Sequence, residues 1–441
     1  MPPTNSSLSQ VRLLVVLQAV GLPCGALAQE GREAQAGGHP DGLRLEATAP
    51  EPRPLTGRIE RIELRGNTRT RDSVILRALR LGPGDVLATG DVPELKRRLL
   101  NLKLFKSVEV LTLPERSGVG LQVDVEERWT LLPIPVFSSG KGQWQAGIFA
   151  LESNLFGLNK TLVAGGMAGN RGGSLFSMFR DPSIGGTRWT GLLSFQFAKT
   201  DRERRNEDVV VDTYTDRRFD IAGTLGYQVT PELNLGVGAF ALVNKPLATE
   251  GGSLAPSRGE VYGVSLSAEY LGQDFHFYFD EGLVVRALLR QGLDFLGSTR
   301  EMRQVTLLAS YTLPVFGTHA LTLTAQHNQS WGDAFLDAQL LGGRTGSRGF
   351  ATGTLWAETA SLATLEYQVP LWSPRMMTLT AHAFVDVGRV EWRNTVLRYV
   401  SPGIGVRAYV REVAIPAVGF EVTRDPQTGD VVTSVAVGFG L

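Results

Sequence analysis

Apolar and polar side chains alternate in short segments from Leu131 to the end of the chain at Leu441, and turn-forming residues separate the segments. In Met377–Gly388, apolar residues occupy one phase, and the other phase holds Thr, His, Phe, Asp and Gly. Alternation with a period of two predicts β-strands with two unlike faces. Counting the segments between turns gives about sixteen strands, and bacterial barrels have an even number.

The unlike faces predict a strand that contacts lipid on one side and water on the other. Apolar outward side chains and polar or small inward ones, in segments of roughly ten residues, are typical of a transmembrane β-barrel. A large soluble β-sandwich also alternates, but its packed core would not accept unpaired charges such as Glu366 and Asp386. We therefore predict a mainly β fold, with a transmembrane antiparallel β-barrel over residues 131–441.

A different pattern precedes the barrel, over residues 57–130. Ile59, Ile62 and Leu64 lie in an alternating segment, which is followed by two segments with helical spacing of leucines and then by two alternating segments. The glycines and proline at 82–84 separate the two helical segments. This order predicts one small α+β domain with the arrangement β-α-α-β-β.

The first 56 residues contain targeting and linker segments. Arg12 precedes the apolar run Leu13–Leu27, and Ala26–Ala28 offers a small-residue cleavage site, so we predict a signal peptide at 1–28. The only cysteine, Cys24, lies inside this run, and the proline before it fits a lipoprotein site poorly. Residues 29–56 lack periodicity and are rich in Gly, Ala, Pro and charge, which predicts a disordered linker. Export without disulfides is compatible with the bacterial envelope.

Composition and charge exclude several functional classes. Lys and Arg number 44, and so do Asp and Glu, whereas nucleic-acid-binding proteins usually carry a basic excess. The five histidines show no metal-ligand spacing, and His382 is the one that clearly occupies the inward phase. No nucleophile, base and orienting group can be assembled from the pattern. We therefore expect no catalytic residue, no metal and no cofactor.

The glycine-rich segment Leu341–Phe350, with sequence LGGRTGSRGF, allows two interpretations. Gly, Thr and Ser form turns, so the segment could be a solvated surface loop. Its Arg348, flanked by Ser347 and Gly349, could instead point into the barrel. Alternation places Asp386 and Glu366 on the inward phase of neighbouring predicted strands, where such an arginine would meet carboxylates.

Several motifs together resemble one known superfamily. They are LRGN at 64–67, LFKSVEV at 104–110, VEERWTLLPIPVF at 125–137, NLFGLNK at 154–160, FRDPSIGGT at 179–187, SRGF at 347–350, LEYQVPL at 365–371 and FVDVG at 384–388. In this order they resemble the BamA and TamA superfamily of outer-membrane assembly and translocation proteins, and residues 57–130 resemble one POTRA domain. The chain differs in having Gln368 where an arginine is common, and in ending on Leu441 rather than on an aromatic residue.

The resemblance implies a location and a role for the glycine-rich segment. In this superfamily the loop with the Arg-Gly-Phe motif is the sixth extracellular loop, folded back into the barrel. Counting turns independently makes residues 332–353 the sixth outer loop. The implied latch consists of Arg348, Gly349 and Phe350 on the loop, with Asp386, Glu366, Phe384 and Gly388 on the barrel wall.

The resemblance also implies a function and partners. We expect a bacterial outer-membrane protein, with its POTRA domain in the periplasm, that assists insertion or translocation of other polypeptides. The expected partners are outer-membrane lipid, unfolded or secreted clients, and a periplasmic accessory protein at the POTRA domain, whose strand edge at Lys106–Leu113 could add a client strand. A passive pore with a docking domain is the alternative. On the closing strand, we expect four side chains to face lipid: Val435, Val437, Phe439 and Leu441.

Overall fold

The computed structural model describes residues 55–437 except 89, 141–142, 171, 207–208, 251–257, 334–335, 344–345, 351–354 and 413–415. The predicted signal peptide lies outside the described residues, and so does the predicted linker except for Leu55 and Thr56. Phe439 and Leu441 of the predicted closing strand also lie outside them.

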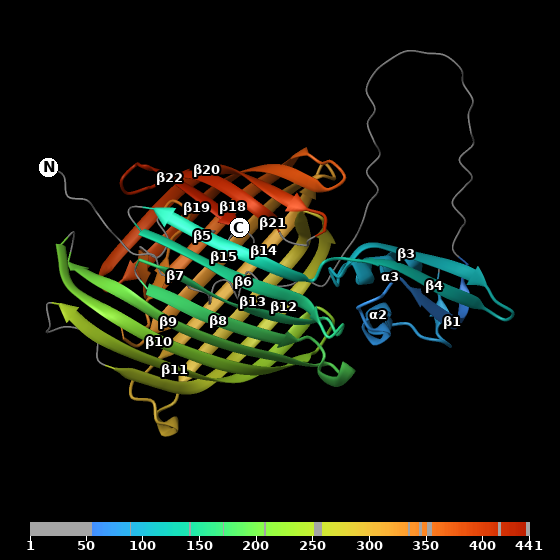
Figure 1. The fold of residues 1–441 in the computed structure, drawn as a ribbon, viewed down its shortest axis with the longest axis horizontal. Helices are drawn as coiled ribbons and strands as arrows, with labels where there is room; N and C mark the ends of the chain where they lie inside the picture. The colour runs from blue at the N-terminus through green and yellow to red at the C-terminus, as the bar shows by residue number, and fades with distance from the viewer. Residues whose placement is uncertain are drawn as a thin grey trace, which may run out of the picture.

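The N-terminal domain is a four-stranded sheet covered by two helices (Figure 1). Its elements are β1 (Gly57–Arg65), α2 (Asp72–Leu79), β2 (Val86–Leu87), α3 (Asp91–Leu100), β3 (Phe105–Pro114) and β4 (Val119–Glu127). The sheet order is β2-β1-β4-β3, so β3 lies at an edge. The short strand β2, which pairs with β1, was not predicted from the sequence.

Both helices bury an apolar face against this sheet because their leucines recur at helical spacing. Leu79 of α2 and Leu95 and Leu99 of α3 are buried with Phe105 of β3. The spacing of leucines over residues 91–105 predicts one helix, and this prediction was wrong at its end, because the helix ends at Leu100 and Lys103 adopts a positive φ of 56°. Leu104 is nevertheless 1% exposed, in the extended segment rather than on a helix.

The rest of the chain forms one antiparallel sheet of sixteen strands curled into a barrel (Figure 1). Its strands are β5 (Leu131–Gly140), β6 (Gln143–Leu155), β7 (Lys160–Gly169), β8 (Gly172–Asp181), β9 (Trp189–Asn206), β10 (Val209–Gln228), β11 (Leu233–Glu250), β12 (Gly259–His276), β13 (Phe279–Gly292), β14 (Arg303–Val315), β15 (His319–Trp331), β18 (Thr359–Trp372), β19 (Met377–Trp392), β20 (Thr395–Val410), β21 (Pro416–Arg424) and β22 (Val431–Val437). Consecutive strands are neighbours, and β15 pairs directly with β18. The predicted mainly β fold and strand number are confirmed.

Between β15 and β18, the chain forms a small separate hairpin. Strand β16 (Gln339–Leu341) pairs with β17 (Leu355–Ala357) rather than with the barrel. The sequence predicts a single strand over Thr354–Leu371, and this prediction was wrong at its start. Residues 355–357 leave the wall to pair with β16, and β18 begins at Thr359.

Alternation separates an outer from an inner face on each barrel strand. On β19, Val385 and Val387 are 40% and 39% exposed, whereas His382 and Asp386 are 3% and 0% exposed. The inner face is buried because side chains and the loop after β16 fill the barrel there. Neither helix in the described part of the chain is long and apolar enough to cross a membrane.

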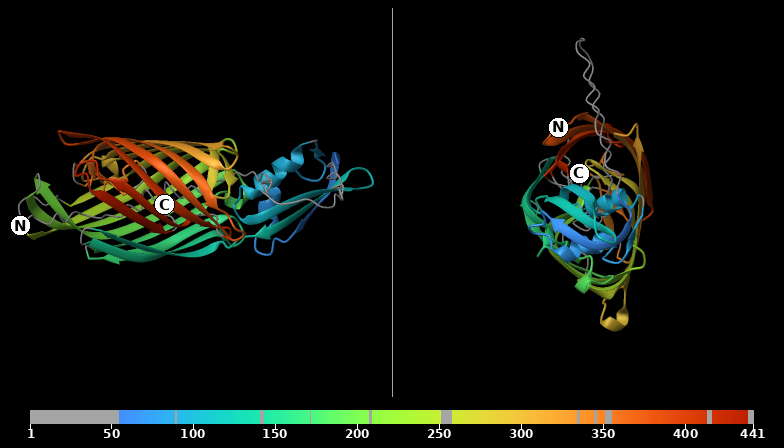
Figure 2. Two further views of the ribbon diagram at one scale, coloured as in Figure 1. Left: turned by 90° about the horizontal axis from the view of Figure 1, so that it is seen from above. Right: turned by 90° about the vertical axis from the view of Figure 1, so that its right-hand side faces the viewer.

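The N-terminal domain lies at one end of the barrel, and along the long axis it overlaps the barrel opening (Figure 2). We call this the proximal end and the opposite one the distal end. The turns β6–β7, β12–β13 and β20–β21 are proximal, whereas the segment between β15 and β18 is distal.

The two faces of β15 predict unequal responses to an added charge. Leu323 faces outward and is 54% exposed, whereas Gln326 has the opposite phase. We expect Leu323→Lys to lower the free energy of unfolding in lipid vesicles by about 2–4 kcal/mol, because its ammonium enters hydrocarbon. Gln326→Lys adds the same charge to the inner face, so it should cost less than half as much. Denaturant titration of both variants measures this, and equal losses would contradict the assigned faces.

Candidate functional site

The loop that follows β16 turns sharply and enters the barrel. We call the described residues 342–343 and 346–350 the inner loop. Gly342, Gly343 and Gly346 have φ values of 122°, 70° and 84°, which side chains rarely allow. The Gly343 amide donates to the carbonyl oxygens of Phe350 at 2.8 Å and Ser347 at 3.1 Å. This compact turn presents Arg348 to the wall.

Arg348 binds Asp386 of β19 through a two-pronged contact. Its Nη2 lies 2.8 Å from Oδ1 of Asp386, and its Nε lies 3.1 Å from Oδ2. The backbone amide of Arg348 also donates to that Oδ2, at 3.0 Å. Arg348 is 3% exposed and Asp386 0%, so water does not screen the pair. A planar guanidinium suits this geometry, whereas an ammonium could not make both contacts.

Arg348 also contacts β18 and an aromatic ring. Its Nη1 lies 2.8 Å from Oε2 of Glu366, on β18. Its Cζ lies 3.3 Å from the ring centroid of Phe384, where the negative face of the ring attracts a cation. Thr364 donates its hydroxyl to Asp386 at 2.7 Å and orients this carboxylate. The arginine therefore joins the inner loop to two neighbouring strands.

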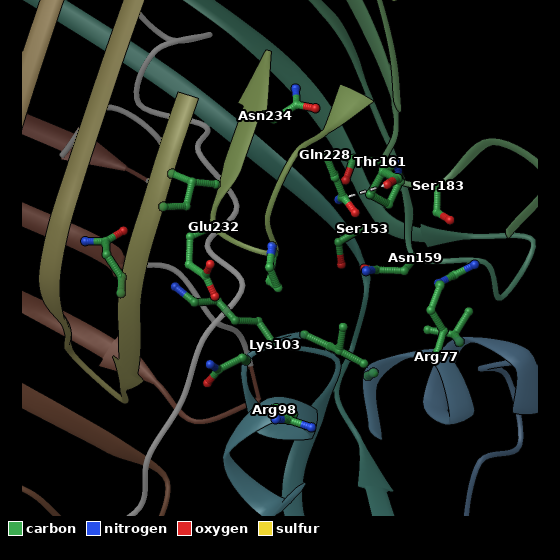
Figure 3. A pocket seen from close by; sticks show the side chains of 18 of the residues that line it. Arg77, Arg98, Lys103, Ser153, Asn159, Thr161, Ser183, Gln228, Glu232 and Asn234 are labelled. Carbon is green, nitrogen blue, oxygen red and sulfur yellow. Dashed lines mark hydrogen bonds between the residues drawn. The ribbon is translucent and has the colours of Figure 1, made fainter. Parts of the chain in front are cut away.

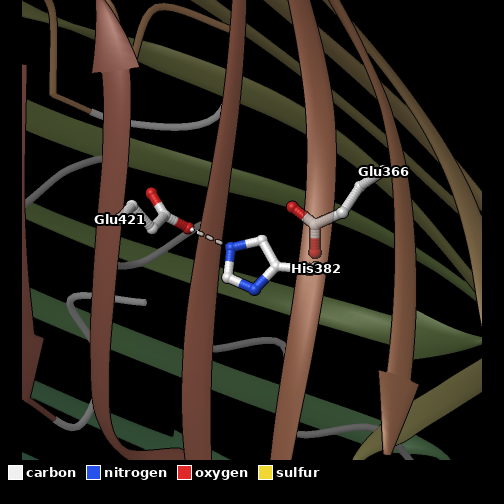
Figure 4. Close-up of side chains that lie close together, drawn as sticks. All are labelled: Glu366, His382 and Glu421. Carbon is white, nitrogen blue, oxygen red and sulfur yellow. Dashed lines mark hydrogen bonds and ion pairs between the residues drawn. The ribbon is translucent and has the colours of Figure 1, made fainter.

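A second set of charges extends the contacts to β20 and β21. Arg407 of β20 binds Glu366 and, at 2.9 Å, Glu421 of β21. His382 of β19 lies between Glu366 and Glu421, and its Nε2 is 3.0 Å from Glu421 (Figure 4). We define the luminal network by its six charged or titratable members, which are Arg348, Glu366, His382, Asp386, Arg407 and Glu421. It spans four adjacent strands and the inner loop.

The position of Arg407 accounts for the departure at Gln368. The sequence has Gln368 where the resembling superfamily commonly has an arginine, two residues after Glu366. In the structure, Arg407 supplies a guanidinium to Glu366 from β20 instead. Gln368 donates to Thr380 and Tyr409 at 2.9 and 3.1 Å, beside this pair. Glu366 of β18 thus still has a positively charged partner, and this partner comes from β20.

Three members of the network have the donor types of a metal site, but arginines compete for them. Ligand atoms of Glu366, His382 and Glu421 lie within 4.8 Å of one another. Both carboxylates already accept from the guanidinium groups of Arg348 and Arg407. A dication there would have to displace these cations or lie beside them. The set therefore functions better as an ion-pair network than as a metal centre.

Glycines on the wall give aromatic side chains room to lie across the sheet. A Cβ at Gly388 would lie 2.3 Å from the Tyr399 ring, and one at Gly403 would lie 2.3 Å from Phe384. The Tyr399 ring packs edge-on against Phe350 of the inner loop, with centroids 4.7 Å apart, and its hydroxyl donates to the Gly346 carbonyl. Gly349 has equally little room, because a Cβ would lie 2.2 Å from Oγ of Ser401.

Salt bridges attach the N-terminal domain to the proximal turns. Arg97 of α3 lies 2.7 Å from Asp274 and Lys103 lies 2.9 Å from Asp280, around the β12–β13 turn. Phe275 of that turn packs into the apolar core of the domain, with the Lys103 ammonium 4.5 Å from its ring centroid. Lys106 of β3 binds Glu412 beside the β20–β21 turn at 2.6 Å.

A further contact between the N-terminal domain and the barrel depends on Glu127, the last residue of β4. Its carboxylate accepts from the Thr68 hydroxyl and from the amides of Arg69 and Thr70, at 2.6–2.9 Å. Burial alone would raise the pKa of Glu127, but these hydrogen bonds, those from Thr70 first, hold it below its ordinary value. The clamped segment contacts the β6–β7 turn, where the Arg71 amide donates to the Gly157 carbonyl at 2.9 Å.

Between the domain and the barrel wall lies a cavity of about 490 Å³ (Figure 3). Arg77, Arg98 and Lys103 line it from the domain, and polar residues such as Glu232 and Asn234 line it from the wall. The lining mixes polar and apolar side chains and carries both signs of charge. This cavity connects the helices of the domain with the proximal turns.

The first and last strands of the barrel meet at a seam. Strands β5 and β22 lie side by side, yet no hydrogen-bonded ladder joins them within the described residues. Pro133 and Pro135 have no N–H, so the continuous β5–β6 ladder must use amides of the intervening residues. The two proline nitrogens therefore face β22, and β5 cannot donate to the seam at these positions.

The structure brings most of the sequence-predicted site residues together. Arg348 contacts Asp386, Glu366 and Phe384, and Phe350 packs on Tyr399, which lies over Gly388. Val435 and Val437 lie opposite Phe420 and Val418 in β21. The members that sequence reasoning missed are Arg407 and Glu421. Each is the inward-phase charge of an otherwise apolar or small-residue segment, which is a signal the sequence does contain.

The described histidines do not form a catalytic set. His327 Nδ1 lies 2.9 Å from the Ser361 hydroxyl, but these residues have the outward phase, and no acid orients the ring among the described residues. His276 and His319 contact Glu281 and Tyr367 near the proximal end.

Two families match the chain. Residues 154–409 match the Omp85 superfamily domain, and residues 57–128 match POTRA, a surface antigen variable number repeat. The first match covers more than half of the chain. The protein therefore belongs to the Omp85 superfamily. It is a bacterial outer-membrane β-barrel with a POTRA domain on the periplasmic side, so the proximal end is periplasmic and the distal end extracellular.

Individual relatives agree with this assignment. The chain is 30% identical over 199 residues to the outer membrane protein assembly factor BamA of Neorickettsia risticii, covering 44% of this chain and 26% of the relative. It is 32% identical over 118 residues to a putative outer membrane protein assembly factor of Treponema pallidum, covering 24% and 14%. The aligned parts thus span about a quarter or less of these curated relatives.

Solved structures show the same fold at low identity. Haemophilus ducreyi BamA lacking POTRA domains 1–3 has a TM-score of 0.53 at 18% identity, with 86% of this chain and 84% of that one covered. CdiB from Acinetobacter baumannii has a TM-score of 0.58 at 14% identity, with 87% and 74% covered.

The buried contact of the inner loop predicts a strong effect of removing one partner. Arg348→Ala leaves Asp386 and Glu366 buried without their shared cation, so we expect a local loss of about 3–5 kcal/mol. Asp386→Ala should cost a similar amount, and the double variant should be no worse than either. The rings of Trp356 and Trp392 contact each other beside the loop, so their fluorescence reports its unfolding in denaturant.

Arg348→Lys is the matched control for this cycle. It keeps the charge but loses the two-pronged geometry, so its loss should be smaller than that of Arg348→Ala. Losses below about 1 kcal/mol in all variants would show that water screens the pair and would reject a structural role.

The hydrogen bonds to Glu127, here called the Glu127 clamp, predict that the contact between the N-terminal domain and the β6–β7 turn depends on pH. Its pKa is lower in the folded state than in the unfolded chain, so its stabilisation is present at neutral pH and disappears as the pH falls through the carboxylate range. Glu127→Gln should cost about 1 kcal/mol at pH 7 and little at pH values below the folded pKa. Hydrogen exchange at the Arg69 and Thr70 amides measures this, and a pH-independent difference would contradict the clamp.

Proposed function

We propose that this protein assists the insertion or translocation of polypeptides at the outer membrane. The observation that carries the proposal is the seam between β5 and β22, whose facing edges lack a ladder in the described residues. Unpaired strand edges present backbone groups that another strand can bind. The two relatives named as outer membrane protein assembly factors support the same activity.

A client would first meet the POTRA domain. Strand β3 lies at the sheet edge, where an extended polypeptide could add by backbone hydrogen bonds. Lys106 at its start already binds Glu412 and Glu126, so the segment from Val108 to Leu113 is the more available part. Exposed apolar side chains elsewhere on the domain, such as Leu76 and Val86, could bind a periplasmic accessory protein.

The luminal network would keep one side of the seam rigid while the seam opens. It joins β18, β19, β20 and β21 to the inner loop, and β21 is the neighbour of β22. In this proposal, the Arg348 contacts fix the C-terminal strands as a block. Opening then takes place between β22 and β5, which no hydrogen-bonded ladder joins within the described residues.

A passive pore is the alternative, because further charges line the barrel. Arg180 and Arg286 bind Glu269 at 2.8 and 2.9 Å, and Arg290 binds Asp220 at 2.9 Å. Such pairs can tune ion selectivity. We infer no enzymatic role, because members of the superfamily are assembly or transport proteins and no nucleophile–base–acid set is present in the described ranges.

Restoring hydrogen-bond donors at the seam tests the proposal. We expect Pro133→Val with Pro135→Val to strengthen the β5–β22 pairing and slow the insertion of an unfolded β-barrel client into vesicles containing the protein at least about fivefold, the equivalent of roughly 1 kcal/mol. The measurement is the rate at which the client becomes protease-resistant.

Pro402→Val on β20 is the control, because this proline lies two strands away from the seam. It should leave the client rate unchanged. If wild-type protein does not accelerate the client but conducts ions across a planar bilayer, the pore is the correct function. Equal client rates for the double variant and the wild type would exclude the seam as the route.

A further inference from the structure

A band of apolar side chains covers the outward faces of β9, β10 and β11, and it ends toward the extracellular side. On β9 the outward side chains Leu193 and Phe197 are 60% and 38% exposed, and on β10 Ile221 and Leu225 are 45% and 48% exposed. Bands of this kind are roughly 25 Å tall and lie in the hydrocarbon of the membrane. On each of the three strands, the next outward position toward the extracellular end is a cation.

These cations form a row directly across the three strands. Arg217 of β10 lies opposite Lys199 of β9 and opposite Lys245 of β11. All three side chains are exposed. Neighbouring strands are about 4.8 Å apart, so three positive charges lie within roughly 10 Å along the rim. We call them the cationic row.

Within the described residues, Glu260 attracts Lys245 at the edge of the cationic row but forms no ion pair with it. None of its members has a hydrogen-bond or ion-pair partner among the described residues, although like charges directly opposite one another destabilise a sheet. The nearest described outward-phase carboxylates also have other partners. Asp201 accepts from the Thr215 hydroxyl at 2.6 Å, and Glu260 binds Arg258 and, at 2.9 Å, the Tyr262 hydroxyl.

The height of the row indicates which groups of the membrane lie beside it. One step below the cations lie Phe197, Phe219 and Val243, which are directly paired with one another. The row therefore marks the boundary between hydrocarbon and head groups. Arg389 and Arg398 likewise lie opposite each other, one outward position beyond Val387 and Val400 on β19 and β20.

We propose that the cationic row binds the phosphate groups of an anionic lipid in the extracellular leaflet. The guanidinium of Arg217 forms two parallel bonds to one phosphate, and the flanking lysines contribute point charges. The acyl chains lie on the apolar positions below the row. This inference does not depend on insertion or translocation activity, since it requires only the membrane placement of the barrel.

Titrating the full-length protein in detergent with phosphatidic acid tests the proposal. Native mass spectrometry gives the apparent Kd, with phosphatidylcholine as the neutral lipid. The triple variant Lys199→Gln, Arg217→Gln, Lys245→Gln should bind phosphatidic acid about tenfold or more weakly, since each cation near an anionic surface contributes roughly fivefold. Phosphatidylcholine binding should not change. Arg217→Gln alone provides a milder version if the triple variant does not fold.

Arg58→Gln, Arg80→Gln, Arg116→Gln is the matched control, because it removes three exposed cations from the POTRA domain. It should retain wild-type affinity. Equal affinity of the wild type and the row variants would overturn the proposal, and so would an equal loss in the control. Displacement of the lipid by millimolar inorganic phosphate, or equally tight binding of poly-glutamate, would assign the row to soluble anions instead.

Discussion

The contact between Arg348 and Asp386 determines how the interior of this barrel is organised. Both groups are almost fully buried, so each requires the other to offset the loss of water. The inner loop must then reach the wall, which explains its positive-φ glycines and the close approach at Gly349. Glu366, Phe384 and Thr364 complete the surroundings of the same guanidinium.

Charged side chains act differently at the periplasmic end of the molecule and in the interior of the barrel. At the periplasmic end, partly exposed pairs such as Arg97–Asp274 are distributed over separate turns, so each contributes little and the domain contact depends on their sum. Inside the barrel, the luminal network shares two guanidinium groups among three carboxylates, and its side chains are mostly buried. Loss of one member there affects the others, and this region should respond as a unit.

Much of the fold could be predicted from sequence because alternation assigns a face to each residue without any knowledge of partners. That was sufficient for the strand number and for placing Asp386 and Glu366 inward. It was insufficient for Arg407 and Glu421, because their meeting with Glu366 depends on register across strands far apart in sequence. The end of α3 was also missed, since Leu102 and Leu104 continue the apolar spacing after the backbone has left the helix.

The two prolines of β5 remove hydrogen-bond donors from one edge of the seam in the barrel wall. At Pro133 and Pro135, β5 can only accept hydrogen bonds from whatever lies beside it, because a proline nitrogen carries no hydrogen. A strand that occupies this position is therefore held by fewer hydrogen bonds than a strand beside an edge without prolines. We therefore expect that strand to dissociate readily. The prolines of β5 thus favour exchange of the neighbouring strand over permanent closure of the barrel.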